Sequence, residues 1–167
     1  YREISNISFD AVFHLAAQPL VLTSYKEPMD TFSINIMGTA NILEALRKIG
    51  SKTVFINFTS DKCYENKEID YAYNENDRLG GHDPYSSSKA CSEIITNSFR
   101  ESFFENKENK ISISTIRAGN VIGGGDWADN RLVPDCIRYF NKKQKLTIRT
   151  PESIRPWQHV FEPISGM

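Results

Sequence analysis

The sequence predicts an α/β fold in which helices alternate with the strands of a mostly parallel sheet. The short apolar run at residues 11–17 predicts a buried parallel strand, and we expect two further strands at residues 53–59 and 111–122. Segments with helical periodicity follow the first two of these strands, at residues 28–49 and from 85 to about 104. Because a right-handed crossover is the rule between parallel strands, this order indicates βαβ units.

The helix expected at residues 28–49 carries one apolar stripe and ends at a glycine. Gly50 is a residue type that commonly stops a helix, whereas Gly38 lies mid-helix, where glycine costs about 1 kcal/mol relative to alanine. We therefore expect Gly38 to mark a close packing contact. The apolar positions at helical spacing are Met29, Phe32, Ile36, Ala40, Leu43 and Leu46.

The helix expected from residue 85 to about 104 has two different stripes, and further short elements follow it. Its apolar stripe comprises Cys91, Ile94, Ile95, Ser98, Phe99 and Phe103, whereas Tyr85, Ser88, Lys89 and Ser92 fall largely on another stripe. Residues 63–83 are polar and predict a loop. We expect a helix at 131–143 and short strands at 146–149 and 155–160.

Composition excludes several classes of function. The chain has 167 residues, a net charge of −1 and a pI of about 6.4, so it has neither the basic footprint of a nucleic-acid binder nor that of a membrane-surface protein. No apolar run approaches the length of a membrane span. Its three cysteines are widely spaced and predict reduced thiols, hence a cytoplasmic location. The three histidines show no metal-ligand spacing, so we expect no metal site.

Tyr85 and Lys89 are the first candidates for catalysis. At a spacing of four residues they lie on one face of a helix, where an ammonium group lowers the pKa of a phenol and so creates a base for an alcohol proton. Removal of that proton together with hydride loss is nicotinamide chemistry. The spacing alone is weak evidence, because Tyr139 and Lys143 share it. Only Tyr85 follows a Gly-Gly-His-Asp-Pro turn and opens a helix just after a strand that ends in Ser60.

The sequence lacks the phosphate loop with which a dinucleotide-binding fold begins. No Gly-x-Gly-x-x-Gly pattern follows an N-terminal strand, and the glycine triplet at residues 123–125 matches neither that pattern nor a P-loop. We interpret the triplet as a flexible turn that faces substrate. Either the chain is not a dinucleotide enzyme, or it starts after the first βαβ unit, which the later residues favour.

Five motifs keep a fixed order along the chain, and their order and spacing carry a resemblance. They are His14-Leu15-Ala16-Ala17-Gln18, Asn35-Ile36-Met37-Gly38-Thr39, Thr59-Ser60-Asp61-Lys62, the Tyr85 to Lys89 segment, and Arg117-Ala118-Gly119-Asn120. The series resembles the extended short-chain dehydrogenase/reductases that modify nucleotide sugars, the epimerase/dehydratase family. Within it, residues 59–68, 119–127 and 154–159 look most like the 4,6-dehydratases that act on CDP-glucose.

This resemblance implies a Rossmann-like fold, a doubly wound parallel sheet, of which the chain would be the middle part. The N-terminal glycine-rich βαβ unit would be missing, and part of a small substrate-binding lobe would be present. Residues 1–122 would form a partial NAD(P)-binding domain and residues 123–167 a partial nucleotide-sugar-binding region, interleaved with it. We expect the chain alone to be inactive, because the pyrophosphate cradle is absent.

The family reaction implies catalytic roles for five residues. It oxidises C4 of the sugar, removes water across C5 and C6, and returns the hydride to C6. Tyr85 would take the C4 hydroxyl proton, Lys89 would lower the tyrosine pKa and hold the nicotinamide ribose, and Ser60 would bind the C4 oxygen. Asp61 would protonate the departing C6 hydroxyl. Lys62 stands where better-known sugar dehydratases carry glutamate, so it leaves open whether it is the C5 base or only stabilises enolate charge.

The resemblance also implies binding residues and partners. The expected cofactor is NAD, although the residues that distinguish it from NADP are not in the chain, and the expected substrate is a nucleotide sugar such as CDP-glucose. A homodimer or higher homo-oligomer is expected in the full-length protein. Cofactor contacts would come from Ala16, Ala17, Gln18, Asn35, Thr59, Ala118 and Gly119, in addition to Tyr85 and Lys89. Substrate contacts would come from Ser24, Asn120, Arg131, Arg149 and Arg155.

Two alternatives remain open at the level of the sequence. The first is another nucleotide-sugar enzyme of the same family, either a 4-epimerase or a different dehydratase. A 4-epimerase shares Tyr85 and Lys89, but has no water to eliminate and so no need for Asp61 and Lys62. A non-catalytic Rossmann-like domain that only binds a nucleotide or a partner is the other alternative. Against it stands the intact set of five catalytic candidates.

Overall fold

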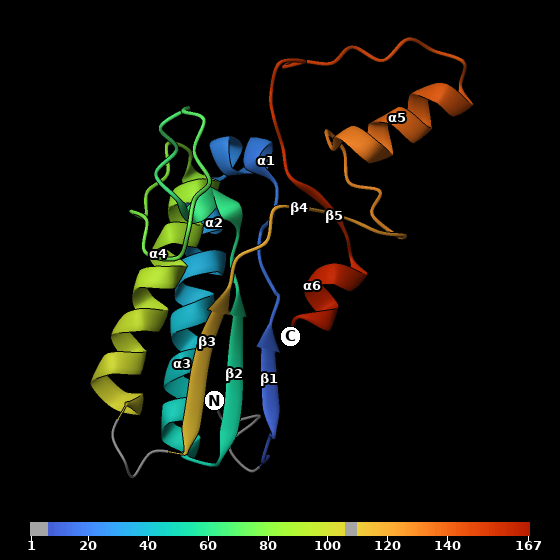
Figure 1. The fold of residues 1–167 in the computed structure, drawn as a ribbon. Coiled ribbons are helices and arrows are strands. Elements are labelled where there is room, and N and C mark those ends of the chain that lie inside the picture. Colours follow the sequence, from blue (N-terminus) through green and yellow to red (C-terminus); the bar gives the residue numbers. More distant parts are fainter. Residues whose placement is uncertain (1–6, 106–109) are drawn as a thin grey trace. The chain divides into compact units, whose positions relative to one another are not determined.

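The computed structural model describes residues 7–105 and 110–167. The chain forms two compact units, Tyr1–Arg117 and Ala118–Met167 (Figure 1). The division between these units falls after Arg117. The boundary expected after residue 122, between a cofactor-binding and a substrate-binding region, stays a prediction. Each unit is described separately below.

The first unit contains a three-stranded parallel sheet. Its strands are β1 (Ala11–His14), β2 (Thr53–Phe58) and β3 (Ile111–Ile116), in the spatial order β1-β2-β3. Ala11 lies opposite Val54, and Thr53 lies opposite Ile111. This topology confirms the parallel sheet that the alternation of strands and helices predicted.

Two of the predicted strands are shorter than expected. β1 ends at His14 rather than at residue 17, and the backbone N–H of Gln18 donates to the side chain of Asn35 instead of to a strand. The run at 111–122 is interrupted after Ile116, where Arg117 leaves the strand and its side chain pairs with Glu93.

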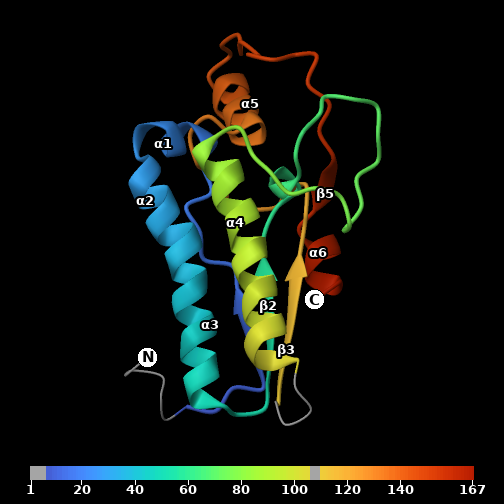
Figure 2. The ribbon, with the colours of Figure 1, turned by 90° about the vertical axis from the view of Figure 1, so that its left-hand side faces the viewer.

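Two long helical runs cover one face of the sheet (Figure 2). After the short α1 (Val21–Lys26), the first run comprises α2 (Pro28–Phe32), a π-helical turn (Ser33–Met37) and α3 (Gly38–Ile49). The second run comprises α4 (Pro84–Phe99) and a π-helical turn (Arg100–Phe104). Gly50 ends α3 with a left-handed φ of 65°, and its N–H donates to the Leu46 carbonyl, as expected for a glycine cap.

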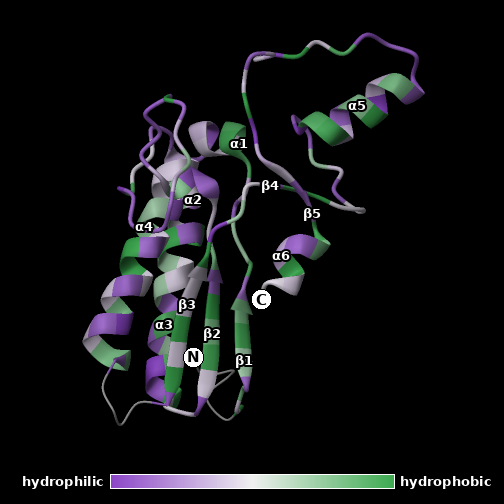
Figure 3. Cartoon of the chain, in the orientation of Figure 1, coloured by the Kyte–Doolittle hydropathy of each residue, from purple (hydrophilic) through white to green (hydrophobic). Residues whose placement is uncertain are grey.

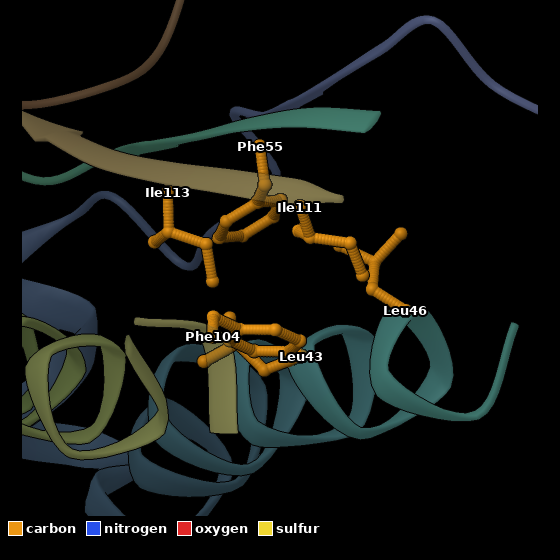
Figure 4. Close-up of a cluster of buried hydrophobic side chains, with 6 residues drawn as sticks. All are labelled: Leu43, Leu46, Phe55, Phe104, Ile111 and Ile113. Atoms are coloured by element: carbon orange, nitrogen blue, oxygen red, sulfur yellow. The ribbon is translucent and has the colours of Figure 1, made fainter. Parts of the chain in front are cut away.

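The apolar core lies where α3 faces the N-terminal halves of the strands. Figure 3 shows hydrophobic residues concentrated along the strands, and Figure 4 shows the cluster that they form with the helices. The buried cluster consists of Leu43, Leu46, Phe55, Phe104, Ile111 and Ile113. Toward the C-terminal ends of the strands, small polar side chains replace this apolar packing.

One expectation about the helices is wrong: a Cβ on Gly38 would meet nothing within 4 Å, so no close packing requires this glycine. The apolar stripes are only partly buried, since Met29 is 75 % exposed. Ile94 on α4 and Phe103 in the π-helical turn after it are exposed as well. The buried face of α4 is instead the polar one, because its side chains hydrogen-bond to the strand ends and to the first helical run. It consists of Ser86, Ser88, Lys89, Ala90, Ser92, Glu93 and Thr96.

The second unit is smaller and contains a two-stranded parallel sheet. Its strands β4 (Asn120–Ile122) and β5 (Trp157–His159) pair directly, with Asn120 opposite Trp157. Its helices are α5 (Leu132–Asn141) and α6 (Phe161–Ser165). The strand expected at 146–149 does not form; there, Arg149 bonds through its side chain to the carbonyl and the side chain of Asn130.

None of the helices in the described part of the chain combines the length and the hydropathy needed to cross a lipid bilayer.

Candidate active site

The first turn of α4 positions Tyr85 through a tightly built helix start. Asp83 caps the helix, since its Oδ1 accepts a 2.9 Å hydrogen bond from the Ser86 N–H and its Oδ2 accepts one of 2.6 Å from the Ser86 hydroxyl. Pro84 occupies the first helical position, where a missing N–H costs nothing. The N–H of Tyr85 donates to Ser24 Oγ at 3.1 Å, which ties this turn to α1.

Lys89 lies one turn farther along α4 and is almost fully buried. Only 7 % of the residue is exposed, and its Nζ donates to the carbonyl of Phe58, the last residue of β2, at 3.2 Å. Burial lowers the pKa of this ammonium below its usual value. A buried cation one helical turn from Tyr85 is the arrangement that the sequence predicted for an activated phenol.

The chain leaves β2 in a short turn that carries the other candidates. Ser60 precedes a 3₁₀ turn at Asp61–Cys63, and its Oγ accepts from the Lys62 N–H at 3.2 Å and donates to Asp61 Oδ1 at 3.1 Å. Asp61 and Lys62 are half-buried, and the turn packs against α4. Burial raises the pKa of the Cys63 thiol to about 12, so this thiol stays protonated and packs as an apolar group.

The predicted cofactor residues of the first unit gather at the same end of the sheet. Asn35 lies in the π-helical turn and is 2 % exposed. Its Oδ1 accepts from the Gln18 N–H at 2.8 Å, and its Nδ2 donates to the Gln18 carbonyl at 3.1 Å. Ala16 and Ala17 immediately precede Gln18 and remain accessible. The structure therefore brings together these residues, for which the resemblance implies contact with the cofactor; the contact itself stays a prediction.

The sequence did not predict the polar network that lies behind these residues. Thr39 Oγ1 lies 3.2 Å from His14 Nε2 and 2.9 Å from Ser92 Oγ, and Asn57 Nδ2 donates to Ser92 Oγ at 3.0 Å. A signal was available, because small polar residues recur at i, i+4 spacing in both helical runs. They are Thr31, Asn35 and Thr39 in the first run and Ser88, Ser92 and Thr96 in the second.

Glu93 is the second feature that sequence reasoning missed. It lies one turn after Lys89 on α4 and is 5 % exposed. Its carboxylate accepts hydrogen bonds from Thr59, Thr115 and Arg117. The sequence did contain a clue to Glu93, because it lies four residues after Lys89, just as Lys89 lies four residues after Tyr85.

The second unit contains a cavity of about 410 Å³ that most of the predicted substrate residues line. Asn120 and the glycine triplet form part of the wall, together with Trp127 and Trp157. Each of the three arginines has a partner of its own: Arg131 pairs with Asp126 at 3.5 Å, Arg149 with the Asn130 carbonyl at 3.1 Å, and Arg155 with the Ile154 carbonyl at 3.2 Å. The lining residues that the sequence singled out are Asn120, Arg131, Arg149 and Arg155.

Two kinds of predicted residue lie outside that cavity. Ser24 belongs to the first unit and is fully buried, with its hydroxyl bonded to α1 and Tyr85; its role toward substrate stays a prediction. Ala118 is buried and Gly119 half-buried at the start of the second unit, next to β4, and their contact with a cofactor also stays a prediction.

Comparison with protein families identifies the chain. A family model described as GDP-mannose 4,6 dehydratase matches residues 1–167. The chain belongs to this family. Its membership confirms the resemblance to nucleotide-sugar dehydratases and epimerases on which the candidate residues were chosen.

Individual relatives agree with the family. The chain is 50 % identical to CDP-glucose 4,6-dehydratase of Salmonella typhimurium over 168 residues, which cover 99 % of this chain and 47 % of the relative. It is 29 % identical to dTDP-D-glucose 4,6-dehydratase of Dictyostelium discoideum, over 94 % of this chain and 37 % of that one. The chain thus spans about half the length of the curated relatives it matches.

Solved structures confirm the fold class. DesIV, a dTDP-glucose 4,6-dehydratase from Streptomyces venezuelae solved with NAD and TYD bound, superimposes with a TM-score of 0.85 at 22 % identity, covering 99 % of this chain and 48 % of its own. UDP-glucuronic acid 4-epimerase from Bacillus cereus, solved with UDP-glucuronic acid and NAD, gives a TM-score of 0.82 at 25 % identity, covering 99 % and 49 %. The Rossmann-like parallel α/β fold expected from the sequence is therefore correct.

Proposed function

We propose that this chain carries the catalytic residues of an NAD-dependent CDP-glucose 4,6-dehydratase. The strongest support is that two pairs of candidate catalytic residues lie at the same end of the sheet. Tyr85 and Lys89 suit the oxidation of an alcohol, and the adjacent Asp61-Lys62 turn suits the elimination of water. The choice of CDP-glucose rests on the 50 % identity to the Salmonella enzyme across 99 % of the chain.

The oxidation half of the reaction is assigned to α4 and the end of β2. Tyr85 takes the proton of the C4 hydroxyl, and the positive charge of Lys89 favours the phenolate that does so. Ser60, 7 % exposed just after β2, turns its hydroxyl from Asp61 to the C4 oxygen when the sugar is bound. NAD, when bound, supplies the hydride acceptor for C4 and the hydride donor for C6.

The elimination half is assigned to the 3₁₀ turn. The ketone formed at C4 acidifies the C5 proton, so that a base can remove it. Asp61 delivers a proton to the C6 hydroxyl, the C6–O bond breaks and water leaves. The ammonium of Lys62, placed next to Asp61, stabilises the enolate oxygen or, when neutral, takes the C5 proton. One turn of chain therefore provides the acid for the C6 hydroxyl and a lysine for the C5 proton or the enolate.

The residues present fit the nicotinamide end of NAD. An ammonium has three donors, and the structure assigns one of those of Lys89 to the Phe58 carbonyl, which leaves donors for the hydroxyls of a ribose. Ala16 and Ala17 present small, accessible side chains beyond β1, where a planar ring could approach the backbone. Lys89, Ala16 and Ala17 would therefore hold this half of the cofactor, with Gln18 and Asn35 fixing the wall behind it.

The arginine-lined cavity of the second unit is assigned to the nucleotide diphosphate. A guanidinium group binds phosphate oxygens through two coplanar hydrogen bonds, and Arg131, Arg149 and Arg155 all line this cavity. Trp127 and Trp157 offer aromatic faces on which a base can stack. These features support a nucleotide sugar as the substrate class of the second unit.

We further propose that the full-length protein is cytoplasmic and forms a homo-oligomer. Exposed apolar side chains on the first helical run and on α4, namely Ile34, Met37 and Ile94, are 46 %, 53 % and 55 % accessible. A second copy that packs against these helices would remove them from water. Sedimentation of the full-length protein tests this: a dimer that dissociates on Ile94→Glu supports the proposal, and a monomer contradicts it.

The activity is tested by the mass of the product. The full-length protein is incubated with CDP-glucose and NAD, and in parallel with UDP-glucose and dTDP-glucose. A product lighter by one water from CDP-glucose alone supports the proposal. An unchanged mass with an altered C4 stereocentre would instead identify an epimerase, the alternative that shares Tyr85 and Lys89. Turnover of none of the three sugars would contradict the proposed substrate.

A further inference from the structure

Glu93 is a buried carboxylate on the face of α4 that carries Tyr85 and Lys89. Its Oε1 accepts from Thr59 Oγ1 and from Arg117 Nε at 3.0 Å, and its Oε2 accepts from Thr115 Oγ1 at 2.9 Å and from Arg117 Nη2 at 3.0 Å. Four donors therefore converge on one carboxylate. They come from the ends of β2 and β3, so Glu93 fastens α4 to both strand ends.

Arg117 extends the same network to the far side of the catalytic turn. Its guanidinium lies 4.8 Å from the ring centroid of Tyr64, the residue that follows the 3₁₀ turn, and its Nη1 donates to the Glu75 carbonyl at 3.3 Å. Two nitrogens of the Arg117 guanidinium bond to Glu93, a third bonds to a loop carbonyl, and its planar face lies over an aromatic ring. These contacts hold the Arg117 side chain in a single orientation.

Glu93 and Arg117 thus contact the residues on either side of the 3₁₀ turn. Thr59, bound to Glu93, comes just before Ser60, and Tyr64, stacked on Arg117, comes just after Cys63. We propose that Glu93 and Arg117 are positioning residues, which hold the Asp61-Lys62 turn against α4 at the place where both can reach the sugar bound at Tyr85. This role rests on the proposed function, since it assigns the geometry of the same reaction.

A buried ion pair suits positioning better than it suits stabilisation. Removing two charges from water costs about as much as their attraction returns, whereas a planar, bidentate pair fixes direction as well as distance. Only 15 % of the Arg117 side chain and 5 % of that of Glu93 are exposed, so water does not loosen the pair. Small displacements of catalytic groups matter, because about 1 Å of misplacement can cost about 100-fold in rate.

Kinetics on the full-length protein provide the first test. Glu93→Gln keeps the size of the side chain and removes its charge, and we expect kcat to fall about 10- to 100-fold with a change in KM below about threefold. Glu44→Gln is the matched control, because Glu44 pairs with Arg47 at 2.6 Å but both side chains are more than a third exposed. The control should leave kcat unchanged.

Hydrogen exchange tests the positioning without reference to any substrate. The amides of Cys63 and Tyr64 donate to the carbonyls of Ser60 and Asp61, within the turn. In Glu93→Gln these amides should exchange at least about tenfold faster, while those of α3 stay unchanged. Unchanged exchange in the turn would overturn the proposal even if the protein proved to have another activity.

The double variant Glu93→Gln/Arg117→Gln separates positioning from stability. It removes both charges of the pair, so neither is left buried without the other, and its thermal midpoint should recover relative to either single variant. If the pair positions the turn, kcat should stay low and the amides of the turn should still exchange faster than in the wild type, despite that recovery. Recovery of all three quantities together would show that the pair is only structural.

Discussion

The side-chain amide of Asn35 and the hydroxyl of Ser88 lie 2.8 Å apart, although 53 positions separate them in the chain. The Ser88 hydroxyl in turn donates to the Tyr85 carbonyl at 2.7 Å, and the other contacts of Asn35 hold Gln18. A single buried amide thus joins the segment after β1, the π-helical turn and the first turn of α4. The residues expected to hold the cofactor and the expected base are fixed to one another through it.

Replacement of Asn35 by alanine should therefore cost more stability than an ordinary surface change. The variant leaves the Gln18 N–H and carbonyl without their partner, and each buried polar group left unsatisfied costs about 1–3 kcal/mol. We expect a loss of about 2–4 kcal/mol in the free energy of unfolding, measured by urea titration. Asn41→Ala, at an exposed position on α3, is the control, and equal losses in the two variants would rule out the network.

Tyr85→Phe should remove activity and leave the fold intact. The phenol is the base for the C4 proton, and the loss of a general base lowers kcat about 10²- to 10⁴-fold. Tyr139→Phe offers a matched control, because Tyr139 has the same spacing to a lysine but is 39 % exposed on α5 of the other unit. Steady-state rates of both variants, with circular dichroism to verify folding, provide the test. Similar losses in the two variants would exclude a special role for Tyr85.

Asp61→Asn and Lys62→Ala should interrupt the elimination after oxidation has taken place. Without the acid, the C6 hydroxyl cannot leave, so Asp61→Asn should accumulate the C4-keto sugar with its oxygen retained at C6. Lys62→Ala should slow the exchange of the C5 hydrogen with deuterated solvent, by about 10²-fold or more if Lys62 is the base. Mass spectrometry of quenched reactions distinguishes these species. Normal dehydration by both variants would show that neither residue takes part.

His14 should make the protein less stable in mild acid. Burial, and then the charge of Lys89, lower the pKa of His14 below its usual value of about 6.5. Below that value the unfolded chain binds a proton that the folded one refuses, so the free energy of unfolding falls as the pH falls from about 6.5 toward 5. Urea titrations of the wild type and His14→Gln across this range test the sign. The difference between them should shrink with falling pH, and a parallel response would contradict the assignment.

The positions of the candidate catalytic residues could be predicted, because each lies at a strand end or a helix start that the local sequence marks, whereas their catalytic roles stay predictions. Asp83, Pro84 and Gly50 encode helix boundaries through local backbone chemistry, and the structure follows them closely. The parallel sheet was likewise predictable, since short strand-like segments alternate along the chain with segments of helical periodicity.

The burial of polar residues could not be predicted in the same way. Hydrophobic periodicity assigns Ser92, Thr96 and Glu93 to the outside of α4, whereas the structure buries them and exposes Ile94. Their burial depends on partners far away in the chain, such as Asn57 and Arg117, which cancel the cost of desolvation through hydrogen bonds. Such pairings follow from the tertiary fold and leave only a faint i, i+4 pattern in the sequence.

The most direct test of the proposed reaction follows a deuterium label at C4 of CDP-glucose. The full-length protein is supplied with the labelled sugar and NAD, and the product is examined by mass spectrometry and by NMR of the C6 methyl group. The mechanism built on Tyr85, Asp61 and Lys62 predicts loss of one water with the deuterium now at C6. Recovery of an unchanged mass, or of a dehydrated sugar whose C6 carries no deuterium, would contradict it.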